Sequence, residues 1–495
     1  MMNRCYKQGT ARSQEALLPA RIEDYVSEDN VVRGIDAYVD TLDLASLGFR
    51  HAGGKRTAGQ PAFSPAALLK LYLIGYLNRV HSSRRLEREC KRNLEVIWLL
   101  EGLRPSYRCI AEFRKLHGKA LQACSKEFVL LCKELDLLGC EVVALDGAFF
   151  NASASDSSIL TKSRLEKDLK QIEADINAYY QGLDEQDRQE QASPEILGES
   201  SGLADKLSQL KERQARKQVQ LKKLEDSGET QLSQTDPDAR MLRKAGQQTV
   251  GYNVQSVVDA RHKLIVHHEV THVGNDAEQL SAQGVVAKGI LGGESLTLLA
   301  DGGYYSEKEL AACQAAGITV YVPVPDKHSS AEAEGRLSSA LFHYSPEQDA
   351  YICPTGQLLH SQGKPAAKNG VLRTRYASQL GSCQNCSHKE SCLPASGRRQ
   401  IWRTEHADTI RAHRLRMAQD GAQRMKERAT LVEHPFGTLK CWFGWQHFLV
   451  RGFEKVRGEM SLMVLAYNLM RVIRIVGLEA FRLLCQQRKA AVLSV

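Results

Sequence analysis

Apolar residues recur every three or four positions through residues 20–140, which is the spacing of helices that bury one face. The segment SPAALLKLYLIGYLNRV begins one such helix, with Ser64 as its N-cap and Pro65 at its first helical position. Two longer segments with the same period follow it, SSRRLERECKRNLEVIWLLEGL and SYRCIAEFRKLHGKALQACSKEFVLLCKELDLL. The pattern predicts an all-α N-terminal domain over residues 1–138.

After residue 138 the apolar residues form short runs that are typical of buried strands. The runs in EVVALDGAFF and SLTLLADGG each end on an aspartate, and GYNVQSVVDARHKLIVHHEVT reads as two strands joined by a turn. Helical segments separate the later strands, the last of which is ITVYVPVP. The order strand, strand, strand, helix, strand, helix, strand predicts an α/β fold with a mixed sheet flanked by helices, over residues 139–158 and 232–326.

Residues 159–231 interrupt this sheet with apolar positions on a heptad spacing. The first set is Leu165, Leu169, Ile172, Ile176 and Tyr179. A second set of leucines continues the same frame beyond the helix-breaking segment QEQASPEILGES. The spacing predicts an antiparallel helical hairpin that forms a coiled coil. The alternative is a solvated helix pair that has no partner.

The two remaining parts of the chain differ in composition. Residues 327–402 lose periodicity and gain Ser, Gly, Pro and Cys, which predicts a small Cys-rich insertion. Residues 403–495 have a helical pattern, and the segment GEMSLMVLAYNLMRVIRIVGLEAF is apolar enough to pack on a sheet. We therefore expect residues 403–495 to form the helical C-terminal part of the sheet domain.

The composition is that of an ordinary globular protein, with 43% apolar and 25% charged residues. No apolar run reaches the ~18 residues that a membrane span needs. The N-terminal sequence also lacks the apolar segment of a secretory signal. We therefore expect a cytoplasmic protein whose cysteines stay reduced.

The net charge of +8 comes from an excess of basic residues after residue 400. Such an excess fits either a surface that binds a polyanion, usually nucleic acid, or a solvated basic helix face. Arg84 and Arg85 lie in a basic helical segment and likewise fit either contacts with a phosphate backbone or a charged outer face. The sequence leaves these alternatives open.

Asp146 and Asp301 each end an apolar strand and precede a glycine. Either Asp-Gly pair alone is more typical of a turn. Two neighbouring strands that both end in carboxylates place hard oxygen ligands at one edge, which suits Mg²⁺ or Mn²⁺. Two such ions roughly 3.5–4 Å apart are able to activate a nucleophile and stabilise the leaving oxygen of a phosphodiester.

A third carboxylate would complete this metal site, and the candidate is Glu433 in RMKERATLVEHPFGTLKCWFGW. The cations Arg424 and Arg428, which are one helical turn apart, precede it, and Lys440 follows it by two turns. Pro435 requires either a kink or a new helix start at this point. On spacing alone, Glu427 and Asp420 are rival third carboxylates. A carboxylate flanked by Arg and Lys is what phosphoryl transfer on DNA would need.

Four motifs in this order resemble the DDE transposases of bacterial insertion sequences. They are LDGAFFNASAS with Asp146, GYNVQSVVD, LADGGYYS with Asp301, and VEHPFGTLK with Glu433. The segment QPAFSPAALLKLYLIGYLNRVHSSRRLERECKRNLEVIWLLEGL also resembles the N-terminal domain of one branch of this group, of the IS-four/IS-five superfamily type. The resemblance extends over most of the chain, about residues 30–480.

The resemblance implies an RNase H-like catalytic core in which Asp146, Asp301 and Glu433 bind Mg²⁺ or Mn²⁺. It further implies double-stranded DNA partners, namely terminal inverted repeats and target DNA, and a homodimer in the synaptic complex. The N-terminal domain would then serve DNA binding or assembly, in the nucleoid of a bacterial cytoplasm. Arg424, Arg428 and Lys440 would bind phosphates. Met425 stands where related transposases carry a tyrosine, so the sequence departs from the family pattern there.

Four cysteines in the Cys-rich insertion form a separate group of candidate ligands. Cys353 lies in YICPTG, and Cys383, Cys386 and Cys392 share CQNCSHKESC. Four thiolates near one another in a reducing compartment favour a tetrahedral structural Zn²⁺ site, with His388 as a substitute ligand. Free thiols are the alternative, and a disulfide is disfavoured.

Two other segments carry weaker candidates. Asp236, Asn253 and Gln255 read first as turn and strand residues, although the resemblance places them close to the active site. The aromatic residues of CWFGWQHF fit a hydrophobic core better than stacking on DNA bases.

The preferred hypothesis is a transposase that performs metal-dependent DNA cleavage and strand transfer. One alternative is a two-metal nuclease that hydrolyses DNA without strand transfer. The other is a non-catalytic DNA-binding protein that retains the basic surface and the Cys-rich insertion.

Overall fold

The computed structural model describes residues 21–52, 61–192, 201–244, 246–325, 335, 337–368, 370–393 and 397–493. The chain divides into two compact units, one formed by Met1–Phe128 with Arg457–Val495 and the other by Val129–Val456. No single helix of the described residues is long and apolar enough to span a membrane. Phe453–Val476 and Leu478–Ala490 meet that length and composition only together, as a pair bent by 111°.

The first unit is helical, as the sequence predicts for the N-terminal region. Its elements before the boundary are α1 (Val32–Val39), α2 (Pro65–Leu77), α3 (Ser83–Arg92), α4 (Leu94–Leu99), α5 (Tyr107–Leu116) and most of α6 (Gly118–Glu134). Helix α2 begins as predicted, because the Ser64 side chain accepts a hydrogen bond from the Ala66 backbone N–H and Pro65 occupies the first turn.

The end of the chain also belongs to this first unit. It contributes most of α14 (Phe453–Val476) and all of α15 (Leu478–Leu493). This corrects the expectation that residues 403–495 pack as one part of the sheet domain, since that segment divides after Val456. The reason is specific packing: Glu459 of α14 pairs with Arg114 of α5 inside the helical unit, at 3.0 Å.

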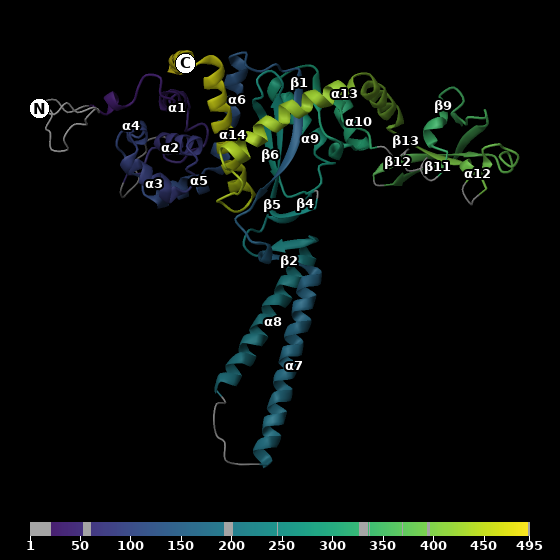
Figure 1. Cartoon of the computed structure of the whole chain (residues 1–495), viewed down its shortest axis with the longest axis horizontal. Coiled ribbons are helices and arrows are strands. Elements are labelled where there is room, and N and C mark those ends of the chain that lie inside the picture. The colour runs from purple at the N-terminus through teal and green to yellow at the C-terminus, as the bar shows by residue number, and fades with distance from the viewer. Residues whose placement is uncertain are drawn as a thin grey trace, which may run out of the picture. The chain divides into compact units, whose positions relative to one another are not determined.

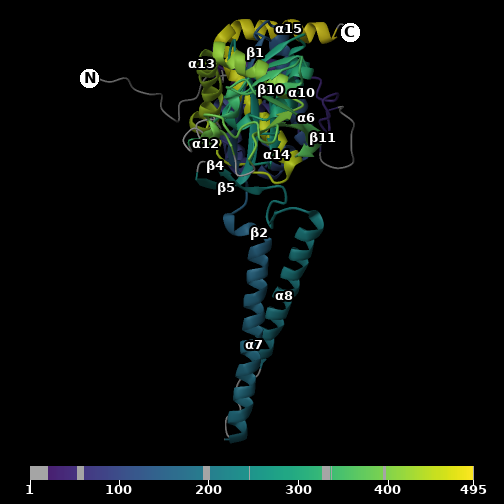
Figure 2. The ribbon, with the colours of Figure 1, turned by 90° about the vertical axis from the view of Figure 1, so that its right-hand side faces the viewer.

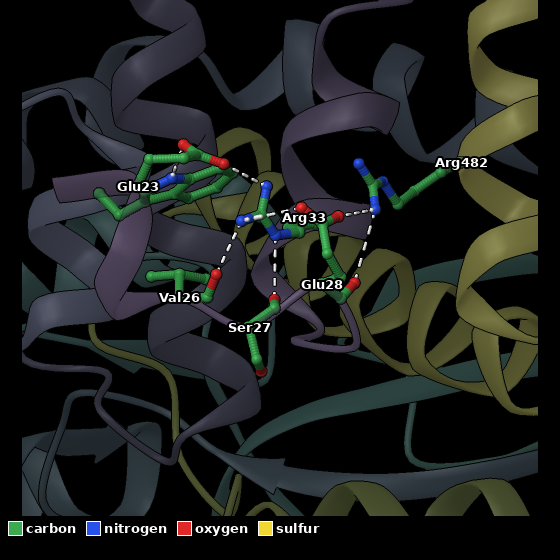
Figure 3. Close-up of polar contacts among 7 residues, drawn as sticks. Glu23, Val26, Ser27, Glu28, Arg33 and Arg482 are labelled. Atoms are coloured by element: carbon green, nitrogen blue, oxygen red, sulfur yellow. Dashed lines mark hydrogen bonds and ion pairs between the residues drawn. The ribbon is translucent and has the colours of Figure 1, made fainter. Parts of the chain in front are cut away.

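Polar contacts around Arg33 join the two ends of the chain in this unit (Figure 3). The Arg33 guanidinium donates to the backbone carbonyls of Val26 and Ser27 at 2.7 and 2.9 Å and pairs with Glu23 at 2.6 Å. Glu28, which lies 3.6 Å from Arg33, also pairs with Arg482 of α15 at 2.8 Å. The first turn of the described chain is therefore held against the last helix.

The second unit is built on a mixed sheet, which agrees with the α/β prediction. Its strands follow the order β4-β5-β1-β7-β8, and β6 also pairs with β5, on the edge opposite β1. The strands are β1 (Val142–Asn151), β4 (Arg240–Lys244), β5 (Gln247–Asp259), β6 (Ile265–Thr271), β7 (Leu296–Leu299) and β8 (Ile318–Tyr321). Strands β1, β5 and β6 are antiparallel in succession, whereas β1, β7 and β8 are parallel.

Helices cover this sheet. They are α9 (Leu280–Leu291), α10 (Glu307–Ala315) and the long α13 (Ala407–Gly437), which runs across the sheet in Figure 1 and contacts β1, β5, β7 and β8. Leu431 and Val432 of α13 pack on Ala144, Leu299 and Tyr321 of the sheet in one hydrophobic cluster. This cluster fixes the face of α13 that packs on the paired residues Ala144 of β1 and Leu299 of β7.

A helical hairpin interrupts the sheet between β1 and β4. Helices α7 (Lys162–Ala192) and α8 (Ser201–Ser227) lie side by side in both views (Figures 1 and 2). Strands β2 (Ile159–Thr161) and β3 (Gln231–Ser233) pair at its base. The base is held by buried Leu160, Leu165 and Leu224. Residues 193–200 of the predicted connecting segment lie outside the described residues.

The Cys-rich insertion contains a five-stranded antiparallel sheet, which the sequence pattern did not predict. Its strands are β9 (His343–Ser345), β10 (Ala350–Ile352), β11 (Leu358–Lys368), β12 (Val371–Ser378) and β13 (Gln400–Thr404), in the order β13-β12-β11-β10-β9. Phe342, Leu359, Tyr376 and Ile401 form its small core. Helix α12 (Lys389–Cys392) is a single turn.

Candidate active site

Parallel pairing of β1 and β7 brings the two predicted aspartates to one edge of the sheet. Ala144 of β1 pairs with Leu299 of β7, and Asp146 and Asp301 each lie two residues further along. Both carboxylates remain partly exposed, at 22% and 35%. The carboxyl-terminal edge of a parallel strand pair is therefore acidic and accessible at this point.

Arg428 of α13 places one guanidinium nitrogen between these two carboxylates. Its Nη2 lies 3.0 Å from Oδ1 of Asp146 and 3.5 Å from Oδ2 of Asp301. The Arg428 side chain is only 14% exposed. The two carboxylates thus face a common point at which a cation is stable, which is the donor chemistry that a hard divalent ion requires.

The other predicted cations lie nearby on or beyond α13. Arg424 pairs with Glu427 at 2.8 Å, so one rival carboxylate is already engaged by a neighbouring cation. Helix α13 continues through Pro435 and ends at Gly437, and a single π-helical turn, Thr438–Trp442, follows it. Lys440 in that turn donates to the Phe149 backbone carbonyl on β1 at 2.7 Å.

Glu433 lies on α13 but is exposed, and it is not gathered with the two aspartates. It follows Arg428 by five residues, which is a rotation of roughly 140° around a helix axis. The buried side of the helix next to Glu433 is formed by Leu431, Val432 and Pro435. Among the residues that the structure describes, no group of three or more His, Cys, Asp or Glu side chains is placed to hold a metal ion.

A buried polar cluster lies beside Gly147, the residue after Asp146, and sequence reasoning missed two of its members, Asp276 and Tyr304. Oδ1 of Asp276 accepts hydrogen bonds from Asn253 Nδ2 and from Gln255 Nε2, both at 2.8 Å. Tyr304 donates a short hydrogen bond to Gln255 Oε1. Burial raises the pKa of Tyr304 strongly, and the carboxylates of Asp276, Asp146 and Asp301 raise it further, so its hydroxyl remains a donor.

The segment around Asp276, THVGNDAEQL, resembles an ordinary loop before a helix, so its sequence carried no separate signal. Asn253 and Gln255, in contrast, were among the weaker candidates and are found beside the site. The third weaker candidate, Asp236, lies elsewhere. Its Oδ1 accepts from the Tyr252 hydroxyl at 2.8 Å and from the Gly452 backbone N–H at 3.0 Å, which is a structural role.

The aromatic segment after α13 is mainly core, in line with the sequence reading. Phe443 and Trp445 are buried and stacked with ring centroids 4.5 Å apart. Trp442 differs from them, because 58% of it is exposed.

The remaining predicted site residues belong to other elements. Arg84 and Arg85 are exposed on α3, and the Arg84 guanidinium lies 5.1 Å from the centroid of the Tyr107 ring. The cysteine group lies in the insertion that contains the small sheet, where one cavity is lined by Cys353, Cys383, Cys386 and Cys392. Cys353 Sγ accepts from the Gln357 backbone N–H at 3.2 Å. These four thiols are not drawn together into coordination geometry.

Comparisons with known proteins agree with the chemistry of this edge. Residues 20–116 match a family model described as a transposase domain (DUF772), and residues 226–469 match one described as a transposase DDE domain. No curated protein matches the chain at a significant level.

One solved structure is similar over most of the chain, the cryo-EM structure of a piggyBac transposase synaptic complex with hairpin DNA. The alignment covers 93% of this chain and 77% of that chain, with 8% identity and a TM-score of 0.31. A TM-score this low does not establish a common fold.

Two carboxylates on adjacent parallel strands of a mixed α/β unit, with a cation presented by a covering helix, are the kind of donor groups that phosphoryl-transfer enzymes use. The two family matches, which follow one another along the chain, specify the class of enzyme further. The chain belongs to the DDE transposases of insertion-sequence type, and it is a transposase.

Proposed function

We propose that this transposase cleaves DNA at the ends of an insertion sequence and joins the freed 3′-hydroxyl groups to target DNA. Asp146, Asp301 and Glu433 are the proposed ligands of Mg²⁺ or Mn²⁺. The observation that carries the proposal is the position of Arg428 Nη2, within 3.5 Å of both aspartates. A site that holds one cation between two carboxylates at a strand edge suits a hard divalent ion.

The proposed reaction needs metal ligands and contacts to the DNA backbone, and different residues supply each. A bound Mg²⁺ would supply a polarised nucleophile and stabilise the leaving oxygen of the phosphodiester. Asp146 and Asp301 would hold it, with Glu433 as the third ligand by its match to the family motif. Lys440, which contacts the β1 backbone beside the site, and Arg424 are the proposed contacts to the DNA backbone, with Arg428 joining them once it leaves the aspartates.

The finer architecture of the proposal follows from the strand order. Three successive antiparallel strands, with two parallel strands on the other side of the first, support an RNase H-like arrangement of the core. The helical hairpin α7–α8 is the proposed coiled coil. Arg84 and Arg85 on α3 are proposed phosphate contacts of the N-terminal domain. The substrates would be terminal inverted repeats and target DNA, bound by a homodimer.

The experiment uses the purified full chain and an end-labelled duplex that spans one end of the genomic segment encoding it, including the flanking DNA. Incubation with Mg²⁺ and a supercoiled plasmid should give a 3′-hydroxyl cut at the segment end and products joined to the plasmid. Asp301→Asn should bind the duplex but leave it uncut. Full Mg²⁺-dependent cutting by Asp301→Asn would overturn the assignment. Cutting without joined products would instead favour the nuclease.

A second proposal concerns the four cysteines, for which we propose a structural Zn²⁺ site. Two separate stretches of the Cys-rich insertion place Cys353, Cys383, Cys386 and Cys392 around one cavity, and the core beside it is small. A metal would stabilise such a minimal core. The full chain should carry about one zinc by elemental analysis. Cys386→Ser should lose the zinc, whereas Cys140→Ser, outside this domain, should keep it. A zinc-free wild type purified without chelator would contradict the proposal.

A further inference from the structure

Asp276, Gln255 and Tyr304 form a continuous chain of hydrogen bonds that the proposed metal ligands do not account for, and Asp276 lies outside the family motifs. The Tyr304 hydroxyl donates to Gln255 Oε1, and Gln255 Nε2 donates to Asp276 Oδ1 at 2.8 Å. Asp276 is 7% exposed, and the other two residues are fully buried. Buried polar groups are costly when unpaired, so the three side chains are retained as a unit.

This chain touches the backbone that carries Asp146. A Cβ placed on Gly147 would lie 2.5 Å from Gln255 Nε2, 2.9 Å from Asp276 Oδ1 and 3.0 Å from the Tyr304 hydroxyl. The glycine that follows Asp146 is therefore needed because the hydrogen-bonded chain fills the space beside it. Gln255 is also the register partner of Gly147 across β1 and β5.

The same chain holds the turn that carries Asp301. Asp301 caps the 3₁₀ turn Gly302–Tyr304, since its Oδ1 accepts the Gly303 backbone N–H at 2.8 Å. Tyr304 is the last residue of that turn, and its hydroxyl reaches Gln255 on β5. A displacement of Tyr304 would therefore displace the turn, and with it the Asp301 carboxylate.

We propose that Asp276 is a positioning residue of the transposase reaction, which acts through Gln255 and Tyr304 to fix the Asp301 carboxylate at its spacing from Asp146. Its carboxylate accepts hydrogen bonds only, so the Gln255 amide must turn Nε2 toward Asp276 and Oε1 toward Tyr304. Asp276 thereby sets the orientation of the amide that receives the Tyr304 hydroxyl. This inference rests on the proposed role of Asp146 and Asp301 as metal ligands.

The test compares Tyr304→Phe and Asp276→Asn with Tyr252→Phe as a matched control. Like Tyr304, Tyr252 is fully buried and its hydroxyl donates to a buried side chain. Tyr252 lies on β5, and its partner, at 2.8 Å, is Asp236, which is outside the site. Two quantities are measured: Mn²⁺ affinity of the DNA-free protein by electron paramagnetic resonance titration, and kcat and KM for cutting the labelled duplex.

Tyr304→Phe and Asp276→Asn should each weaken Mn²⁺ binding and lower kcat, by about 10- to 100-fold, the range found for residues that orient metal ligands. KM for the duplex should stay within about twofold, because the DNA contacts are made by other residues. The double variant should be no worse than the more damaged single variant, since both act through one hydrogen-bonded chain. Tyr252→Phe should leave Mn²⁺ affinity and kcat unchanged.

Wild-type Mn²⁺ affinity and kcat in both Tyr304→Phe and Asp276→Asn would overturn the inference. An equal loss in Tyr252→Phe would do so too, because it would show a general effect of removing a buried hydroxyl. Failure of the proposed function would give a different result. If Asp301 is not a metal ligand, Asp301→Asn would cut the duplex normally, whatever the behaviour of the Asp276 variant.

Discussion

Nη2 of Arg428 lies 3.0 Å from Oδ1 of Asp146, although 282 residues separate the two in the sequence. The same nitrogen lies 3.5 Å from Oδ2 of Asp301. Two carboxylates that share an edge repel one another, and the guanidinium relieves that repulsion. A divalent ion that enters between the aspartates has to displace Arg428, which is then available to a DNA phosphate. In the proposed reaction, one side chain would therefore link metal binding to DNA contact.

Removing this competitor should strengthen metal binding while it impairs the reaction. We expect Arg428→Gln to raise the Mn²⁺ affinity of the DNA-free protein by about tenfold, because the ion no longer competes with a cation. Cutting of the labelled duplex at saturating Mg²⁺ should fall, because a phosphate contact is lost. Calorimetric Mn²⁺ titration measures the first effect. Arg424→Gln is the control, since Arg424 pairs with Glu427 instead. An unchanged Mn²⁺ affinity in Arg428→Gln would contradict the linkage.

Glu433 and Glu427 are six residues apart on α13, and substitution decides between them as the third ligand. Glu433→Gln should abolish Mg²⁺-dependent cutting and leave binding of the duplex intact, because it removes one metal ligand without changing side-chain size. Glu427→Gln should keep most of the cutting, since that carboxylate is engaged by Arg424 at 2.8 Å. Cutting rates and gel-shift affinities of both variants test this assignment. The reverse pattern would transfer the role to Glu427.

His413 on α13 makes the stability of the sheet unit depend on pH. The side chain is fully buried, and its Nε2 accepts from the Val322 backbone N–H at 3.4 Å. Burial lowers its pKa to about 4, with Arg416 and Arg414 adding to the effect. The unfolded chain, with a pKa near 6.5, binds the proton more tightly, so the stabilisation is present above pH 6.5 and is lost as the pH falls toward 4.

The full effect is on the order of 3 kcal/mol. Urea unfolding at pH 7.5 and 5.0 should show a larger loss of unfolding free energy for the wild type than for His413→Gln, which keeps an acceptor but does not titrate. The difference between the two proteins isolates His413 from other titrating groups. Equal losses in both would show that His413 does not carry this dependence.

The sequence was sufficient to place Asp146 and Asp301 directly after apolar strand residues. The strand end predicted at Asp146 is wrong, because pairing with β5 continues β1 to Asn151, whereas β7 does end at Leu299, before Asp301. The sequence marks the apolar run locally but not this long-range pairing. It was not sufficient for Asp276. The segment GNDAEQL has the composition of any helix start, and its role depends on β5 lying beside β1, a long-range register. The sequence likewise assigned no role to Tyr304, whose hydroxyl donates a hydrogen bond to Gln255 Oε1 in the structure.

The two fold features that sequence reasoning missed have different physical causes. The small sheet of the Cys-rich insertion buries few residues, and most of β11 is exposed, so its strands lack the alternation that reveals a strand. The sequence of helix α14 did not predict which part of the chain the helix packs against, for the opposite reason. Its residues from Met460 to Val472 are almost all buried, so its pattern is apolar all round and does not distinguish a sheet from a helical bundle.

The partner of α14 can be tested through the buried ion pair between Glu459 and Arg114. The side chains are 1% and 6% exposed, and Oε1 of Glu459 also accepts from the Tyr76 hydroxyl at 3.2 Å. Burial alone would lower the pKa of Arg114, but Glu459 raises it on balance, so the pair stays ionised. Glu459→Gln would leave a buried guanidinium uncompensated, which costs about 3–5 kcal/mol. Hydrogen exchange of α5 and α14 should accelerate accordingly.

Two further variants control this prediction. Glu87→Gln, which breaks an exposed pair with Lys91, should change the free energy of unfolding by less than about 1 kcal/mol. The double variant Arg114→Met with Glu459→Leu should restore most of the protection from hydrogen exchange, because an apolar pair leaves no unpaired charge. Normal protection of α5 in Glu459→Gln would argue against this packing of α14 in the helical unit.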